Sequence, residues 1–562
     1  MTLPPIQHNR HRSKRERNAT LALLRSLVVA LTITPITLAA ETAEGVSDRF
    51  AIQRFAILGG TILPAAELDA LVAPFTGPAR EYGDIQRALE AVEFAYRQRG
   101  YAAVQVYVPE QDITEGVVII EVSESVIGAV TIEPLNESAQ TWFNAENLRA
   151  SLPALQEGET PNAFKLSSEV ALANENPAKQ LEVVLALAEA EGEVNARILV
   201  NASNPLRLNL SLDNSGNDQT GRHRLGMTLQ HANLWNRDHV GSVAYQTSPE
   251  KPDKVEIFSL SYRLPLYAVA GALDFIYAKS TVDAGVTQTT AGDLSFAGSG
   301  QVLGLRYTHA LPRRGDMTQK LIIGWDNKSN DNECSLGDFG AAGCGAAASD
   351  VTLRPLSLTY QRTTLAPGAA SEGNVTLVYN LPGGSNGEDA DFAASRPSPD
   401  GAAGATADYK LIKGSYTYFT LLPDDWQLRL VGQAQYSPQP LVGQEQMGMS
   451  GSRALRGFLD REVSRDRGVM LNLEGYTPDF ATKTGLPGSL RALAFVDAAT
   501  GKNELLQGEV QPPASLASGG FGLRYVGSPQ FDATLDMARV ITANGTQEQG
   551  DTRSHFTLNV NF

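Results

Sequence analysis

The sequence predicts a transmembrane antiparallel β-barrel of about 16 strands, preceded by two small α+β domains. Three observations predict this fold class. Strand-length segments of alternating residues recur from residue 206 to residue 562, whereas helical periodicity is confined to the residues before them. The order of strands and helices over residues 49–125 returns over residues 126–204, which indicates a duplicated module. The chain also ends in a strand with one apolar and one polar face.

The composition favours a modular, extracytoplasmic protein. The 562 residues exceed what one soluble core usually organises. There are 46 Lys and Arg against 62 Asp and Glu, a formal net charge of -16, so we expect no nucleic-acid partner. Beyond the N-terminus, no run approaches the roughly 18 apolar residues that a spanning helix needs. Any membrane passage must therefore use strands.

The first 40 residues have the order of a secretory signal peptide. Basic residues at positions 10–17 precede an apolar stretch from Leu21, and small residues follow it. That order predicts cleavage near residues 39–43. The alternative is a retained anchor helix, which the short apolar core and Pro35 disfavour.

Residues 49–125 read as strand, helix, helix, strand, strand. Pro64 stands where the first helix would begin, and Asp84 would cap the second. The second helix would end at Arg99-Gly100, a cationic last turn closed by glycine. Strands are expected at residues 50–57, 103–108 and 116–122.

The same order follows in the second module. A strand is expected at residues 126–132, helices at 145–151 and 163–174, and a strand pair at 181–188 and 194–201. A unit of roughly 75 residues is too small for an enzyme core and is suited to binding.

Sixteen strand segments are expected in the remainder of the chain. They are residues 208–215, 224–233, 240–247, 255–264, 271–280, 302–310, 320–328, 352–362, 374–381, 408–420, 427–436, 468–476, 490–497, 519–526, 532–541 and 554–562. Long connectors rich in Gly, Ser and Asp alternate with short ones, as external loops and periplasmic turns do in outer-membrane barrels. A soluble β-sandwich gives no reason for that alternation.

The last strand carries the alternation of a lipid-facing and a lumen-facing side. Its apolar side consists of Phe556, Leu558, Val560 and Phe562. An ordinary half-buried strand would alternate in the same way, but a terminal aromatic residue with no tail favours the membrane.

Cys334 and Cys344 lie in one stretch rich in Gly and Ala. In an oxidising compartment this spacing favours a disulfide loop, with free thiols as the alternative. Ligands for a metal do not stand nearby, and we expect neither a metal nor another cofactor.

An enzymatic function finds little support. The histidines show no H-E-x-x-H spacing. Residues 383–387 match G-x-S-x-G, but they lie in a Gly-rich connector rather than at the strand-to-helix turn that a nucleophile would need.

One motif carries a resemblance to a known family. The segment with Arg453, Leu455, Arg456, Gly457 and Phe458 is similar to the Val-Arg-Gly-Phe/Tyr loop tip of the two-partner secretion transporters of the TpsB type, also called haemolysin secretion/activation proteins. Their members pair two polypeptide-transport-associated (POTRA) domains with a sixteen-stranded barrel, so the resemblance covers nearly everything after the signal peptide.

The position of this motif agrees with the family. It lies in the long connector 437–467, between the eleventh and twelfth expected strands, where the family places its sixth external loop, folded into the pore. Two further segments resemble the start of the next strand and an inward acidic wall motif. They are Asp466, Arg467 and Gly468, and then Phe495 and Asp497.

A loop that returns into a water-filled lumen needs an anchor, and Arg456 offers a planar, permanently charged donor. Asp497 is the candidate acceptor. Gly457 would allow close backbone approach, and Phe458 would pack against the wall. If this pair is shielded, removing one partner costs about 3 to 5 kcal/mol, whereas an exposed pair contributes about 0 to 1 kcal/mol. The alternative is a solvated surface turn.

The resemblance implies that the POTRA domains capture an unfolded substrate by strand addition, which requires an open sheet edge. By the family's strand order, the open edges would carry Val104, Val106 and Val108 in the first domain, and Leu181, Val183 and Leu185 in the second. The alternative is that these are core strands.

The resemblance implies export of a partner exoprotein, haemolysin-like or adhesin-like, across the bacterial outer membrane, with the POTRA domains in the periplasm. Other expected partners are outer-membrane lipid and the barrel-assembly machinery, and a monomer is expected. A barrel-assembly insertase of the same superfamily and a passive porin are the alternatives. Many relatives have a plug helix before the first domain; only a few residues separate the expected cleavage site from Arg49 here, so plug gating is not expected.

Overall fold

The computed structural model describes residues 49–113, 115–217, 220–280, 285–289, 292–296, 300–330, 349–399, 404–544 and 547–562. The expected signal peptide and the pair Cys334 and Cys344 lie outside the described residues. Among the described helices, none is long and apolar enough to cross a bilayer.

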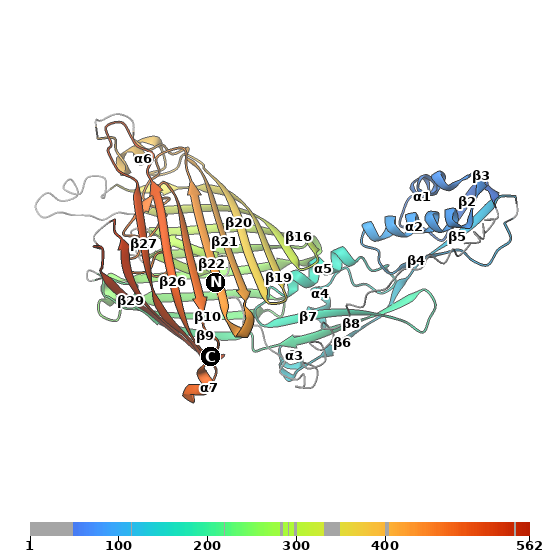
Figure 1. Ribbon diagram of the computed structural model, residues 1–562, viewed down its shortest axis with the longest axis horizontal. Coiled ribbons are helices and arrows are strands. Elements are labelled where there is room, and N and C mark those ends of the chain that lie inside the picture. Colours follow the sequence, from blue (N-terminus) through green and yellow to red (C-terminus); the bar gives the residue numbers. More distant parts are fainter. Residues whose placement is uncertain are drawn as a thin grey trace, which may run out of the picture. The chain divides into compact units, whose positions relative to one another are not determined.

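The first module consists of two helices and small sheets (Figure 1). Its elements are β1 (Phe50–Ile52), β2 (Arg54–Leu58), α1 (Ala65–Val72), β3 (Gly77–Arg80), α2 (Tyr82–Gln98), β4 (Val104–Tyr107) and β5 (Val117–Glu124). β1 pairs with β3. In the other sheet β5 is central, parallel to β2 and antiparallel to β4.

Helix α2 begins earlier than the sequence suggested. Glu81 is its N-cap, and the prediction that Asp84 caps the helix is wrong. Asp84 is the third helical residue, and its carboxylate accepts a hydrogen bond of 3.0 Å from the Glu81 N–H, which closes a capping box. Each of the two acidic side chains accepts a hydrogen bond from the backbone N–H of the other residue. Residue type alone therefore does not show which of them is the N-cap.

The second module repeats the first. Its elements are β6 (Val126–Pro134), α3 (Glu137–Trp142), α4 (Ala145–Ala150), α5 (Ala163–Ala173), β7 (Lys179–Leu187) and β8 (Glu193–Ala202). β8 is central, parallel to β6 and antiparallel to β7, which is the arrangement that β5 has in the first module. The two α+β sheets thus confirm the predicted pair.

A closed antiparallel barrel follows, as predicted. Its strands are β9 (Leu206–Asp213), β10 (Arg224–Leu234), β11 (His239–Thr247), β12 (Glu256–Leu266), β13 (Gly271–Ser280), β16 (Gly300–Arg314), β17 (Met317–Asn330), β18 (Val351–Leu353), β19 (Pro355–Ala366), β20 (Ala369–Asn380), β21 (Lys410–Leu421), β22 (Gln427–Tyr436), β25 (Arg467–Tyr476), β26 (Ser489–Lys502), β27 (Ala514–Ser528), β28 (Phe531–Thr542) and β29 (Thr552–Asn561). β18 and β19 both pair with β17 and form one strand interrupted at Arg354, which gives sixteen. β29 pairs with β9 and closes the cylinder.

The two faces of the wall differ in chemistry. Along β25, for example, Val469, Leu471 and Leu473 are exposed, whereas the alternate residues Asn472 and Glu474 are buried. Exposed apolar residues on the outside are typical of a wall that contacts lipid, and the polar residues line the lumen.

The connectors opposite the modules carry further elements. They are the hairpin β14 (Gly285–Thr289) and β15 (Gly292–Phe296), helix α6 (Asp389–Ser395), and the pair β23 (Met447–Gly448) and β24 (Ser464–Arg465). Helix α7 (Ala481–Thr484) lies in the connector from β25 to β26, at the module end of the barrel.

Candidate functional site

The connector from β22 to β25, residues 437–466, folds back into the barrel; we call it the lumen loop. β23 and β24 pair near its base, with Met447 opposite Arg465. Beyond this pair, the loop tip contacts inward side chains of β25, β26, β28 and β29. The tip therefore lies inside the cylinder, against one side of its wall.

Arg456 binds Asp497 of β26 through two parallel hydrogen bonds. The Nε atom donates to Oδ2 at 2.8 Å and Nη2 donates to Oδ1 at 2.7 Å, while the Arg456 backbone N–H donates to Oδ2 at 3.2 Å. The guanidinium carbon lies 3.5 Å from the ring centroid of Phe495. Arg456 is 4 % exposed and Asp497 is 0 % exposed. The contact is thus a desolvated, bidentate pair, not a surface turn.

Two further carboxylates surround the same guanidinium. Nη1 of Arg456 donates to Glu474 at 2.7 Å and lies 3.7 Å from Asp536. Each of these carboxylates also has its own wall arginine: Arg429 binds Glu474 at 3.0 Å, and Arg524 binds Asp536 at 2.8 Å.

The six groups form what we call the wall network: Arg429, Arg456 and Arg524 with Glu474, Asp497 and Asp536. Its three cations balance its three anions. Burial disfavours the charged form of Arg456, but the hydrogen bonds and charges of Asp497, aided by Glu474, outweigh burial and raise the pKa of Arg456 above its ordinary value. Arg456 is therefore a fixed charge, and within the network Asp497 depends on it alone.

Packing fixes the rest of the tip. Gly457 has φ +96°, a conformation that favours glycine, and an added Cβ would lie 3.3 Å from the Ala538 Cβ. Its N–H donates to Nε2 of His555 at 3.0 Å. Leu455 and Phe458 are fully buried in one apolar cluster that includes wall residues of β25, β26, β27 and β28.

The base of the loop has its own anchors. Asp466 is fully buried and accepts hydrogen bonds of 2.8 Å from Arg396, just after α6. It also accepts from Gln446 at 2.9 Å and from the N–H of Glu504 at 2.9 Å, so Asp466 joins three external connectors.

Glu445 is a second anchor near the base. It accepts from Lys328 of β17 at 2.8 Å and from Lys413 of β21 at 3.2 Å. Burial raises the pKa of Glu445, but the two lysines outweigh burial and lower it to about 2. No motif in the sequence indicated Glu445 or its lysines, because the three groups lie far apart in the chain.

Three motif residues lie away from the wall network. Arg453 is exposed on the loop. Arg467 faces outward at the start of β25, where it binds Glu504 at 2.5 Å. Gly468 follows on β25, and a Cβ there would meet the Thr500 carbonyl oxygen at 2.8 Å.

The residues expected at the module edges lie on edge strands, with one exception. β4, which contains Val104 and Val106, pairs only with β5 among the described residues, and Val108 lies beyond the end of β4. β7 likewise pairs only with β8 within the described part of the chain, and it contains Leu181, Val183 and Leu185. Val104 and Leu181 are buried, whereas Leu185 is exposed.

The C-terminal residues complete the wall. Leu558 pairs with Leu212 and Val560 with Leu210, so these side chains continue the outward apolar row of β9. Phe562 is 68 % exposed, and its N–H donates to the Leu208 carbonyl at 2.8 Å.

A polar cluster that the sequence did not indicate joins the second module to the turn between β10 and β11. Lys179 of β7 binds Asp238, and both are buried. Asp238 also accepts from Asn147 at 3.1 Å and from Tyr267 at 2.6 Å. A single Lys in an edge strand gives no sequence signal for such a role.

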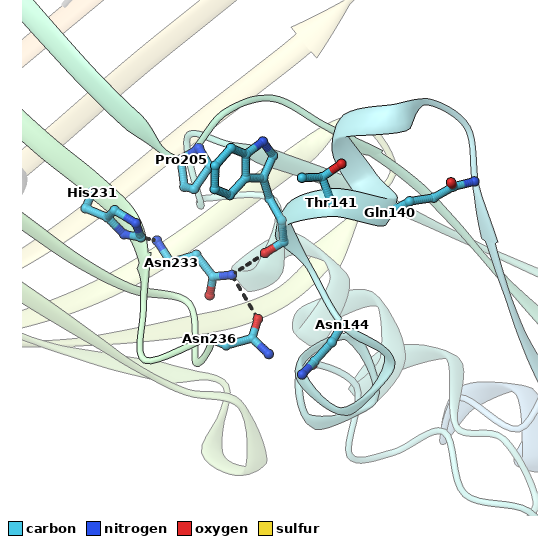
Figure 2. A pocket seen from close by; sticks show the side chains of 8 residues that line it. Gln140, Thr141, Asn144, Pro205, His231, Asn233 and Asn236 are labelled. Atoms are coloured by element: carbon cyan, nitrogen blue, oxygen red, sulfur yellow. Dashed lines mark hydrogen bonds between the residues drawn. The ribbon is translucent and has the colours of Figure 1, made fainter.

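A pocket of about 350 Å³ lies beside this cluster (Figure 2). Asn233 crosses from the barrel to α3 there: its Nδ2 donates to the Trp142 carbonyl at 2.8 Å and to Asn236 Oδ1 at 3.0 Å. The contacts of Asp238 and Asn233 tie the module to the barrel rim.

Ser385 of the G-x-S-x-G segment is exposed in the connector between β20 and α6. Over the described ranges, no group of three or more His, Cys, Asp or Glu side chains could hold a metal ion.

Comparison with known proteins agrees with this architecture. The family profile "Haemolysin secretion/activation protein ShlB/FhaC/HecB" matches residues 192–525, and the profile "POTRA domain, ShlB-type" matches residues 50–125. The outer membrane transporter CdiB of Escherichia coli is 25 % identical over 505 residues, which cover 87 % of this chain and 77 % of that protein.

Two solved structures share the fold. CdiB from Escherichia coli has a TM-score of 0.71 and 21 % identity, covering 94 % of this chain and 93 % of that one. CdiB from Acinetobacter baumannii has a TM-score of 0.64 and 17 % identity, with 92 % and 90 % covered. Because the first family profile spans more than half of the residues, the chain belongs to the haemolysin secretion/activation proteins ShlB/FhaC/HecB and is a TpsB-type outer-membrane transporter that secretes a partner exoprotein, not an enzyme.

Proposed function

We propose that this transporter passes one unfolded, haemolysin-like or adhesin-like exoprotein through its barrel lumen, and that the lumen loop held by Arg456 is part of the export path. The proposal assigns residues 49–125 and 126–204 to substrate capture and residues 206–562 to translocation. The observation that carries it is the buried pairing of Arg456 with Asp497, which fixes a long loop inside a polar lumen.

A passive porin would not need the buried pair of Arg456 and Asp497. A passive pore has no use for a desolvated cation that binds wall carboxylates, because such a pair contributes little net stability to a barrel. A loop that must keep one position beside a moving polypeptide does need it. Arg456 makes bidentate and packing contacts at once, which gives geometric specificity.

Capture is assigned to the edges β4 and β7. Each offers one row of backbone N–H and C=O groups, with which an extended chain can pair regardless of its sequence. On β7 the exposed Leu185 and Leu187 add apolar contact for alternate side chains of a bound strand.

Crosslinking tests this capture step. A photoreactive residue at Gln105 of β4 or Glu182 of β7, both exposed, should crosslink to the exoprotein in secreting cells. Asp69 on α1, also exposed, is the matched control and should give no product. Equal crosslinking from all three positions would contradict strand addition.

Gene deletion distinguishes export from barrel assembly. Loss of this transporter should leave its exoprotein in the periplasm while other outer-membrane barrels keep their abundance. Broad loss of other barrels would instead indicate an insertase, and secretion that continues unchanged would refute the proposal.

A further inference from the structure

The outer surface of the barrel carries a cationic groove near its external rim. It lies over β21, β22, β25 and β26, has a volume of about 560 Å³, and is lined mainly by apolar atoms. The residues that matter for its chemistry are Ile412, Tyr436, Arg467, Val469, Thr500 and Lys502, which we call the outer groove.

Strand register places these side chains on the lipid side. Ile412, Tyr436 and Val469 are about half exposed, whereas their chain neighbours Leu411, Gln435 and Met470 are buried. All are at the strand ends opposite the modules, so they lie at the level of the outer leaflet. Charged residues on this face are costly near the bilayer centre but tolerated near the interface.

Two cations stand directly opposite each other in this groove. Arg467 of β25 pairs in register with Lys502 of β26, and like charges at such positions repel. The Nε atom of Arg467 is buried with no hydrogen-bond partner among the described residues. Glu504 binds the other end of the Arg467 guanidinium and offsets one of the two charges.

Two cations at this rim also contact aromatic rings. The Arg467 guanidinium lies 5.6 Å from the ring centroid of Tyr436, its neighbour on β22. Lys410 at the start of β21 lies 5.6 Å from the ring centroid of Tyr379 on β20. Three cations, Lys410, Arg467 and Lys502, therefore lie at the external ends of β21, β25 and β26, although the chain as a whole has a net charge of -16.

We propose that the outer groove binds a phosphorylated, acylated glycolipid of the outer leaflet. Its phosphate would lie between Arg467 and Lys502, with Lys410 nearby, and its acyl chains along Ile412 and Val469. Small side chains below the cations, such as Thr500, leave the space that makes the wall concave. Charge-assisted contacts to phosphate explain two opposed cations, which a purely apolar lipid would not.

Native mass spectrometry of the detergent-purified transporter tests the proposal, with bisphosphorylated lipid A as the probe. Wild type should retain lipid A, and Lys410→Ser/Lys502→Ser should weaken its binding by roughly tenfold or more. Lys279→Ser is the matched control, since Lys279 is exposed near the external end of β13, away from the groove, and should change binding less than about twofold.

Two further arms decide the source of the phosphate. Dephosphorylated lipid A should bind at least about tenfold more weakly than the bisphosphorylated form. Inorganic pyrophosphate should fail to displace lipid A. Full displacement by pyrophosphate, equal binding of both lipids, or unchanged binding by the double variant would each overturn the proposal. Heat-modifiable gel migration checks that every variant is a folded barrel.

Discussion

Replacing Arg456 by Ala should open the lumen loop, and the wall network sets the size of the effect. Glu474 keeps Arg429, and Asp536 keeps Arg524, but Asp497 loses Arg456, its one partner in the network, and with it both side-chain hydrogen bonds. Because Asp497 is fully buried in the closed loop, an unpaired charge there costs about 3 to 5 kcal/mol. In the open loop Asp497 faces water in the lumen. The closed-to-open ratio should therefore fall roughly 150- to 5,000-fold.

The converse change should cost less. In Asp497→Ala the Arg456 guanidinium keeps Glu474 at 2.7 Å, so no buried charge is left without a partner. The bidentate contact to Asp497, taken as one charge-assisted interaction, contributes about 1.5 to 3 kcal/mol. The double variant removes both the cation and the stranded anion, so its cost should not exceed that of Arg456→Ala alone. A coupling of about 1.5 kcal/mol or more is expected, against the near-additivity of independent sites.

Hydrogen exchange of the tip measures this cycle. The reporter is the Gly457 N–H, which is bonded to His555, in a peptide that spans residues 449–463. Exchange of this peptide should be slow in the wild type, fastest in Arg456→Ala and intermediate in Asp497→Ala. Effects of the two substitutions that add within about 0.5 kcal/mol would refute the reasoning, because the residues would then act independently.

Three further predictions follow from burial. Phe458→Ala should speed exchange of the same peptide, because removing a buried aromatic side chain costs about 3 to 5 kcal/mol; unchanged exchange would contradict the packing. Lys179→Met should strand the buried Asp238 and increase protease cleavage at the module junction, whereas equal cleavage would refute that role. Burial raises the pKa of Glu169 in α5 to about 7, so the folded state holds a proton that the unfolded state releases, and stability falls as pH rises from 5 to 8. Glu169→Gln should abolish that slope in thermal unfolding of the intact protein, and a slope that persists would exclude Glu169.

The barrel was predictable because its signal is local and repeated. Each strand shows alternating apolar and polar residues. The alternation of long and short connectors indicates which end of each strand is the external one. The strand boundaries were predicted less accurately than the strands themselves. The strand predicted at residues 352–362 is interrupted at Arg354, and the residues 50–57, predicted as one strand, form two. Helix α3 was missed because its six residues are too few to show a period.

The candidate site was predictable only in part. Arg456 and Asp497 belong to motifs, and the structure brings their side chains together across 41 positions. Glu474, Asp536 and His555 carry no motif; they meet Arg456 or Gly457 only because the barrel closes. These contacts depend on which residues of neighbouring strands pair with each other. An alternating pattern shows which side chains share a face, but it does not fix this register, because a shift by two residues leaves the pattern unchanged.

A comparison of exoprotein secretion by the Arg456→Ala and Arg453→Ala variants tests the central claim most directly. Both substitutions remove one arginine from the same loop, but Arg453 is exposed and Arg456 is buried in the wall network. At equal barrel abundance in the outer membrane, Arg456→Ala should lose most secretion of the exoprotein, and Arg453→Ala should keep it. Secretion that is equal in both variants and in the wild type would contradict the account.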